Sequence, residues 1–190
     1  IRNITLLKNI SKYLLTNISA PFSRRSYYNV LKNSMSVGKD TLGEYVSYLE
    51  DINLVYLVPI FSYSLKKQQV NPHKIYCIDT GLRSAVAFRF SGDCGKIAEN
   101  IVFIELKRRG YEIFYWKDHK EVDFVIKDIS GKLTAINVSY TNNIENREID
   151  GLKEFVGKFD ADLILLTKDL GKTVEGIDFI PLWKWIININ

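Results

Sequence analysis

One stretch, residues 95–140, constrains the fold of this chain more than any other. It begins with a run of helical periodicity that Gly110 closes, as glycine often does after the last turn of a helix. Strand-like runs follow, and they predict the strands Tyr111–Trp116, Glu121–Ile126 and Leu133–Tyr140. The stretch therefore predicts a helix that leads directly into three consecutive strands.

A carboxylate lies on the apolar side of this predicted helix. At about 100° per residue, Glu99 falls on the arc that also carries Phe103 and Leu106. Burying a carboxylate costs free energy unless it finds a partner or a cation. We therefore expect Glu99 to contribute to a site beneath the sheet.

Strand alternation groups further polar side chains, because every second residue of a strand points to the same face. Glu121 is therefore expected beside Asp123. In the next strand, Asn137 is expected beside Ser139. In the strand Glu121–Ile126, the side chains expected on the opposite face are Val122, Phe124 and Ile126.

Composition narrows the class of protein. A chain of 190 residues with 46% hydrophobic and 13% aromatic residues is not disordered and has room for one large domain or two small ones. No apolar run reaches the ~20 residues of a membrane span. Cys77 and Cys94 form neither a disulfide framework nor a CxxC metal motif, so we expect a reduced, cytoplasmic location. The chain begins at Ile1, which suggests a piece of a longer protein.

The first 80 residues predict three helices and a β-hairpin. The predicted helices cover residues 4–18, Ser26–Asn33 and a run that opens at Asp40 or Thr41. The predicted hairpin strands are Leu54–Tyr63 and Lys74–Asp79, joined by a basic loop at 64–73. Three short helices and a hairpin form the winged-helix pattern. We therefore expect a winged-helix domain at 1–80, a linker at 81–94 and a second domain at 95–190.

The excess positive charge lies in this first part. Residues 1–80 hold ten Lys and Arg against five Asp and Glu, a net +5, and residues 81–190 hold sixteen against seventeen, a net −1. This is a hint of a polyanionic partner such as DNA. A winged helix also serves as an interdomain or protein–protein module, and that alternative stays open.

The third predicted helix is a poor DNA reader, because between Lys39 and Asp51 it holds four acidic residues against one lysine. If DNA binds, we expect the 64–73 loop and the second helix to touch it. The candidate nucleic-acid-binding residues are Arg24, Arg25, Lys32, Lys39, Lys66, Lys67, His73 and Lys74.

The rest of the chain predicts a helix at Arg147–Phe159 and a strand at Leu163–Thr167. An unbroken apolar run such as Leu163–Leu166 is typical of a strand covered on both faces. A second short strand is expected near 176–180, and a last helix from Pro181. The expected fold class is mixed α/β, with an α-β-β-β-α-β order in the second domain.

This order, with an acidic residue on the first helix and another on the second strand, resembles the PD-(D/E)XK nuclease superfamily. The whole chain resembles the C-terminal part of archaeal and bacterial AAA-type ATPases, in which a winged helix and a nuclease-like domain of unassigned function follow the ATPase domain. The stretches that carry the likeness begin at Tyr45, Lys74, Ile97, Glu121, Asn137, Arg147 and Ile180. No GxxxxGK[ST] P-loop occurs, so ATP and its Mg²⁺ are implied only for an ATPase domain outside this sequence.

The resemblance assigns nuclease positions but also shows departures from the motif. Glu99 and Asp123 match the first two acidic positions, which would hold Mg²⁺, whereas the E-x-K motif maps onto Asn137-Val138-Ser139. A site that lacks the third carboxylate and the lysine should bind Mg²⁺ poorly. Glu121 and Lys153 are the candidates to replace the lost groups.

We therefore expect Glu99, Asp123, Asn137 and Ser139 to form a hydrogen-bonded polar cluster without catalysis. The predicted function is a DNA- or partner-binding module attached to an ATPase domain. Two alternatives stay open: an active metal-dependent nuclease with a rearranged site, and a module for protein contacts or oligomerisation only.

Overall fold

Eight helices and two β-sheets form the part of the chain that the computed structural model describes, residues 3–35, 37–87 and 93–187. The expected mixture of helices and strands is therefore confirmed. Among the described residues, none of the helices combines the length and apolar character needed to cross a bilayer.

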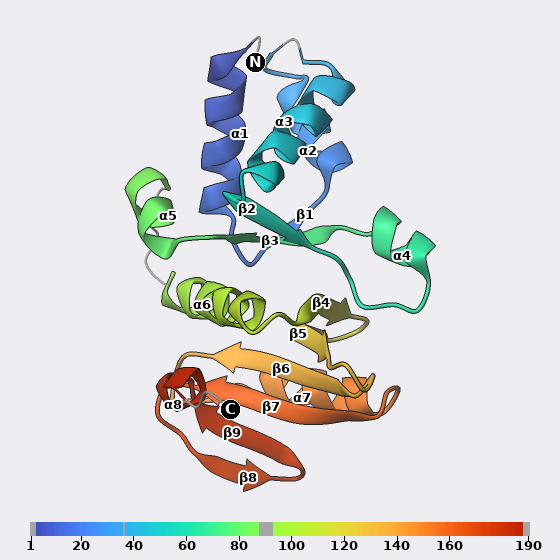
Figure 1. The fold of residues 1–190 in the computed structure, drawn as a ribbon, viewed down its shortest axis with the longest axis vertical. Coiled ribbons are helices and arrows are strands. Elements are labelled where there is room, and N and C mark those ends of the chain that lie inside the picture. The colour runs from blue at the N-terminus through green and yellow to red at the C-terminus, as the bar shows by residue number, and fades with distance from the viewer. Residues whose placement is uncertain (1–2, 36, 88–92, 188–190) are drawn as a thin grey trace.

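Three helices and a small sheet form the first half (Figure 1). The helices are α1 (Ile4–Thr16), α2 (Arg24–Leu31) and α3 (Lys39–Asp51), and they share one apolar core. The strands are β1 (Pro21–Phe22), β2 (Val55–Val58) and β3 (His73–Cys77), in the antiparallel order β1-β3-β2. Side chains cap two of the helices, because Asn3 accepts the Leu6 N–H and Ser23 accepts the Ser26 N–H.

Two short helices occupy segments where the sequence predicted a loop and a linker. Helix α4 (Leu65–Val70) lies within the expected 64–73 loop, and the Ser64 side chain accepts the Lys67 N–H at its start. Helix α5 (Thr80–Val86) begins one residue before the expected 81–94 linker and fills its first part. The Asp79 carboxylate caps it by accepting two backbone N–H groups.

The second half is a six-stranded sheet between helices. Its elements are α6 (Cys94–Arg108), β4 (Glu112–Lys117), β5 (Glu121–Lys127), β6 (Leu133–Ser139), α7 (Asn146–Val156), β7 (Ala161–Thr167), β8 (Lys172–Val174), β9 (Ile177–Pro181) and α8 (Leu182–Ile187). The strand order is β4-β5-β6-β7-β9-β8, with parallel pairs at β6–β7 and β7–β9. Helix α6 packs on one face and α7 on the other, so the sheet has an apolar core on each side.

Strand β8 is absent from the sequence-based expectation. It forms a hairpin with β9 through Glu175 and Gly176, both of which have positive φ. Two central residues with positive φ are typical of a tight two-residue hairpin turn. Pro181 is the last residue of β9, so the final helix begins one residue later than predicted.

A register shift in β5 corrects the predicted faces of that strand. Phe114 pairs with Val125 and Trp116 pairs with Val122, so β5 holds one residue more than β4 over this interval. The extra residue turns Phe124 toward the α6 side with Ile126, whereas Val122 stays on the α7 side. The simple alternation expected for these apolar residues is therefore wrong beyond Asp123.

The two halves are joined by backbone and side-chain contacts. Ile60 forms a parallel bridge with Tyr115 of β4, which extends the first half along the edge of the second sheet. The Tyr76 ring of β3 stacks on Phe103 of α6 with centroids 4.5 Å apart. Helix α6 therefore lies between the two sheets and packs against both halves (Figure 1).

Candidate functional site: a lysine among three carboxylates

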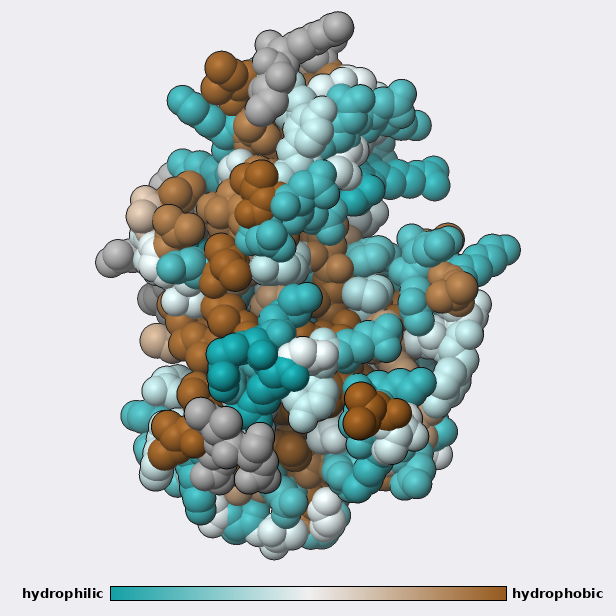
Figure 2. Space-filling view, viewed as in Figure 1, coloured by the Kyte–Doolittle hydropathy of each residue, from teal (hydrophilic) through white to brown (hydrophobic). Residues whose placement is uncertain are grey.

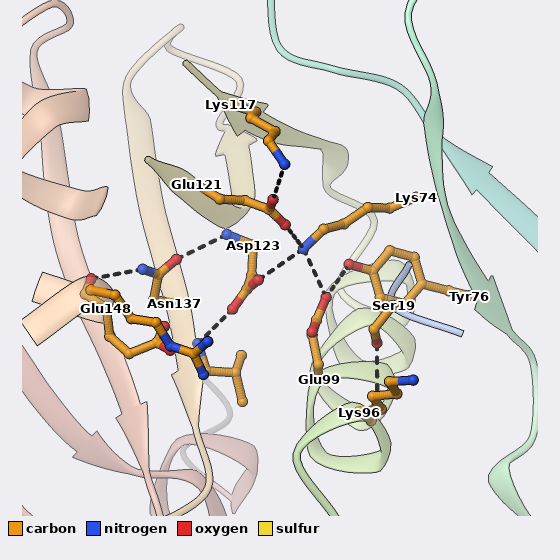
Figure 3. Close-up of polar contacts among 12 residues, drawn as sticks. Ser19, Lys74, Tyr76, Lys96, Glu99, Lys117, Glu121, Asp123, Asn137 and Glu148 are labelled. Carbon is orange, nitrogen blue, oxygen red and sulfur yellow. Dashed lines mark hydrogen bonds and ion pairs between the residues drawn. The ribbon is translucent and has the colours of Figure 1, made fainter. Parts of the chain in front are cut away.

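The carboxylates expected to form a site do converge, and a lysine lies at their centre (Figure 3). The Lys74 ammonium is 2.8 Å from Asp123 Oδ1, 2.8 Å from Glu121 Oε1 and 3.1 Å from Glu99 Oε1. Glu99 comes from α6 and the other two acids from the start of β5. The predicted pairing of Glu121 with Asp123 is observed, because both reach the same ammonium group.

Lys74 corrects one of the predicted nucleic-acid contacts. It lies in β3, the central strand of the first sheet, and is only 1% exposed. Its side chain points away from solvent toward α6 and β5, so it is not available to DNA phosphates (Figure 3). The first half of the chain thus supplies the cation of a cluster whose acids belong to the second half.

Tyr76 completes the inner side of the cluster. Its hydroxyl donates a hydrogen bond of 2.6 Å to Glu99 Oε1, and in β3 it shares a face with Lys74 two residues earlier. Burial, reinforced by the Glu99 carboxylate, holds the pKa of Tyr76 well above its usual value. The hydroxyl therefore stays protonated and serves as a hydrogen-bond donor.

The protonation states of the cluster follow from the contact of one ammonium group with three carboxyl groups. Burial alone would lower the pKa of Lys74, but Asp123 and Glu99 raise it well above the ordinary value, so the ammonium is retained. Burial and the Asp123 charge raise the pKa of Glu99 to about 7, against the opposing effect of Lys74. Burial also opposes ionisation of Glu121, yet the Lys74 ammonium prevails and lowers its pKa.

Asn137 has a backbone-pairing role. Its Oδ1 accepts the Asp123 N–H at 2.9 Å and its Nδ2 donates to the Glu148 carbonyl oxygen at 2.7 Å. Asp123 in turn accepts the Val138 N–H at 3.0 Å. Backbone pairing of β5 with β6 runs up to the Phe124–Ile136 pair, and these side chains continue the connection beyond it.

Two other candidates lie apart from the cluster. Ser139 is buried at the end of β6 and pairs with Thr167 of β7, and among the described residues its hydroxyl has no hydrogen bond to Glu99 or Asp123. Lys153 forms an ion pair with Glu175 and therefore does not stand in for the missing motif lysine. The expected four-residue cluster is thus limited to Glu99, Asp123 and Asn137, with Glu121 added.

A cleft of about 500 Å³ opens beside the cluster, and Glu99, Glu121 and Asp123 line it. Arg147 and Glu148 of α7 also line it. Burial, followed by the Asp123 charge, raises the pKa of Glu148 to about 7. Sequence analysis did not single out Glu148 as a site residue, although it lies in one of the stretches that carry the resemblance.

Tyr76 was likewise not singled out, and Lys74 was assigned to nucleic acid and not to this cluster, but a signal for both exists. A lysine two residues before a tyrosine in a strand places both polar groups on one face, which indicates a shared polar contact beneath the sheet. The position of the partner acids, 25 and 49 residues further along, is set only by the tertiary fold.

The residues present do not fit a resident Mg²⁺ at Glu99 and Asp123. An oxygen of each of the three cluster carboxylates already contacts the Lys74 ammonium, and the second oxygen of Asp123 accepts a backbone N–H. The Asn137 amide is occupied by backbone groups on both sides. Mg²⁺ demands near-octahedral oxygen ligands, and this arrangement offers an ammonium group in that place.

The remaining basic candidates lie on the outside of the first half. Those that are exposed are Arg24, Arg25, Lys32, Lys39, Lys66 and Lys67. His73 is half-buried, and burial followed by the Arg24 charge lowers its pKa. A groove of about 390 Å³ between α2 and α4 is lined by Arg24, Arg25 and His73. In Figure 2 the surface over α2 and α4, on the right, is mainly hydrophilic and flanks a notch.

Two family models match the chain, one for each half. Residues 1–92 match a domain of unknown function, DUF8612, and residues 94–185 match a second domain of unknown function, DUF4143. No solved structure matches the chain.

Two uncharacterised proteins are similar over nearly the full chain. One, from Methanocaldococcus jannaschii, is 29% identical over 203 residues, covering 97% of this chain and 45% of the relative. The other, from Haemophilus influenzae, is 24% identical over 189 residues, covering 98% of this chain and 47% of the relative. The chain therefore spans less than half the length of these relatives, and its two halves are similar to DUF8612 and DUF4143 in turn.

Proposed function

We propose that this chain is the non-catalytic, DNA-binding C-terminal part of an AAA-type ATPase. In this proposal a winged-helix unit carries the DNA-binding surface and a nuclease-like unit supports it. The observation that carries the absence of catalysis is the burial of the Lys74 ammonium among Glu99, Glu121 and Asp123.

Two findings support the assignment of the units. The three helices and antiparallel sheet of the first half are in keeping with a winged helix, with α4 in place of an extended wing. The order α6, β4, β5, β6, α7, β7 and the parallel β6–β7 pair are in keeping with a nuclease-like unit. DUF4143 is often found at the C-terminus of AAA ATPases, and the relatives are long enough to hold a further domain.

The chemistry of the cluster favours binding over cleavage. A metal-dependent nuclease needs carboxylates that hold an ion and a lysine that helps to activate water. Here the acids neutralise a buried lysine, Asn137 pairs with backbone groups, and Ser139 lies apart. These residues orient the strands and neutralise charge, and the acids of the cluster are engaged with the Lys74 ammonium.

The DNA-binding surface is proposed to comprise α2 and α4. Arg25, Lys66 and Lys67 are exposed there, and among the described residues none of them forms an ion pair. Arg24 is paired with Glu50 at 3.0 Å but remains half exposed. The acidic face of α3 is proposed to lie away from the phosphates.

Fluorescence anisotropy of a labelled DNA duplex tests this surface. The double variant Lys66→Ala/Lys67→Ala should weaken binding about tenfold at low salt and reduce the slope of log affinity against log salt by about two. The matched control Lys168→Ala/Lys184→Ala removes two exposed lysines of the second half and should leave both quantities unchanged. Equal losses in the two variants, or no salt-dependent binding by the wild type, would favour a protein-binding or oligomerisation module.

Plasmid cleavage and calorimetry with Mg²⁺ or Mn²⁺ test the nuclease alternative. We expect neither cleavage nor specific ion uptake by the wild-type chain. Cleavage that is present in the wild type and lost in Asp123→Ala would overturn the non-catalytic proposal.

A further inference from the structure

We propose that the Lys74 ammonium is a built-in substitute for a divalent cation, so that removing it turns the Glu99–Glu121–Asp123 cluster into a binding site for a hard divalent ion. The inference goes beyond the proposed function, because it depends on the cluster alone and holds whether or not the chain binds DNA.

The carboxylates of the cluster converge on one point, the Lys74 nitrogen. Three carboxylate oxygens, from Glu99, Glu121 and Asp123, lie 2.8–3.1 Å from the Lys74 nitrogen. The acids approach from two separate elements, α6 and β5. Carboxylate oxygens that converge from separate elements on a single cation are the ligand type that proteins use for Ca²⁺, which takes about 6–8 oxygens, so waters would complete the set.

The position of the Lys74 ammonium is fixed by the fold. Lys74 is 1% exposed and lies in the central strand of its sheet, so its ammonium has a fixed position. Tyr76 fixes Glu99 through its hydroxyl, and the Val138 N–H fixes Asp123. Glu99 and Asp123 are therefore held in place by partners other than Lys74 and should keep their positions when the ammonium is removed. Among the described residues, the Glu121 carboxylate then keeps only its exposed partner Lys117.

The negative charge of the three carboxylates also favours a divalent ion. A single ammonium faces three carboxylates, and Lys117 contributes a second positive charge only at the outer oxygen of Glu121, 3.2 Å away. A divalent ion neutralises the cluster better than the ammonium does. Ca²⁺, which accepts 2.3–2.6 Å distances and irregular geometry, needs less movement of the acids than Mg²⁺, which demands near-octahedral ligands at 2.0–2.1 Å.

Isothermal calorimetry with Ca²⁺, Mn²⁺ and Mg²⁺ on the full chain tests the proposal. Lys74→Ala removes the charge and opens space for an ion with its waters. We expect this variant to take up one Ca²⁺ at least about tenfold more tightly than any ion uptake by the wild type. Mg²⁺ should bind more weakly than Ca²⁺.

Three controls assign the ion to the cluster. Lys74→Ala/Asp123→Asn should lose the gained uptake because a ligand is removed. Lys74→Arg keeps a cation in place and should gain none, and Lys74→Met fills the space and should also gain none. The group Asp118, His119 and Glu154, of which the first two are exposed, is common to all variants, so any ion that it binds gives the same background throughout.

Folding of the variant is followed by circular dichroism, with and without a large excess of Ca²⁺ over the Kd that calorimetry gives. If Lys74→Ala is unfolded alone, Ca²⁺ should restore its structure. A folded Lys74→Ala that takes up no more ion than the wild type would overturn the proposal. So would an unfolded one that Ca²⁺ does not rescue, or wild-type uptake that Asp123→Asn abolishes.

Discussion

Helices α6 and α7 cover opposite faces of the same sheet, but they do so with different chemistry. Helix α6 lies between two sheets and buries polar residues, including Asn100 and Glu105, along with its apolar ones. Helix α7 has the six-stranded sheet on one side only and buries Gly151, Leu152 and Phe155. Because α6 has packing partners on two sides, it buries polar residues at positions where the corresponding side of α7 faces solvent.

The polar groups of α6 have defined partners. Asn100 accepts the Cys77 N–H and donates to the Cys77 carbonyl oxygen, and Glu99 reaches Lys74. These contacts all lead to β3 of the first half. The comparison teaches that polar side chains of α6 join the two halves, whereas the side chains that α7 buries against the sheet are apolar and its contact with Asn137 is made by a backbone carbonyl oxygen.

The largest effect is expected where α7 approaches the sheet. A Cβ at Gly151 would overlap the Glu121 carbonyl oxygen and lie 3.3 Å from Asn137 Nδ2. Gly151→Ala should lower the free energy of unfolding by about 4 kcal/mol, because the obstacle is backbone that cannot rotate away. Urea unfolding measures it.

Gly157→Ala is the matched control at the end of the same helix. Its Cβ would meet carbonyl oxygens at 3.5 Å, an ordinary contact, and its φ is −65°. Equal stabilities of the two variants would contradict the tight approach of α7.

The second effect concerns Asn100, which is fully buried. Asn100→Ala leaves the N–H and C=O of Cys77 without partners and should cost about 2–3 kcal/mol. Hydrogen exchange at the Cys77 amide should accelerate accordingly. The control is Asn142→Ala, whose side chain bonds Asp169 at the surface and should cost much less. A similar cost for both would remove the special role of α6.

The third effect is a pH dependence at Glu148, the α7 acid that faces the cleft. Its folded pKa of about 7 is above the ordinary 4.5, so folding favours the protonated form. The resulting stabilisation is complete below about pH 4.5 and is lost as the pH rises through 7. Between pH 5 and 8 the wild type should lose roughly 2 kcal/mol through this group, and Glu148→Gln should flatten that part of the profile. An unchanged slope in the variant would contradict the burial of this carboxyl group.

The smallest effect on stability is expected for a surface ion pair that lies outside α6 and α7. Arg24 and Glu50 form an ion pair at 3.0 Å whose side chains are 50% and 31% exposed. Arg24→Ala should change the free energy of unfolding by about 0.5 kcal/mol or less, because solvent screens the pair. A loss as large as that of Asn100→Ala would show that surface contacts matter as much as the buried ones.

Much of the fold is local and was predictable from the sequence. Helical periodicity located α1, α3 and α6, and the alternating runs located β5 and β6 within a residue or two. The short helices α4 and α5 were missed, although Ser64 and Asp79 carry the side chains that cap them. Short helices have weak periodicity, so their caps are the better signal.

The candidate site was predictable only on its acidic side. Glu99 was found because a carboxylate on an apolar helix face needs a partner, and Asp123 was found through strand alternation with Glu121 and through the resemblance. The partner itself, Lys74, was assigned to DNA together with the other basic residues of the first 80, and only the tertiary fold brings it to the acids. The register shift in β5 was equally out of reach, since it arises from pairing with β4.

The bridge between Ile60 and Tyr115 has a consequence for how copies of the molecule meet one another in concentrated solution. Phe61 N–H and the Pro59 carbonyl oxygen occupy the backbone groups of Tyr115 on the free flank of β4. On the opposite flank β8 has three residues and begins with Lys172. A flank blocked by its own chain and a flank that is short and charged both discourage strand-to-strand association, so we expect the native molecule to resist amyloid-like growth.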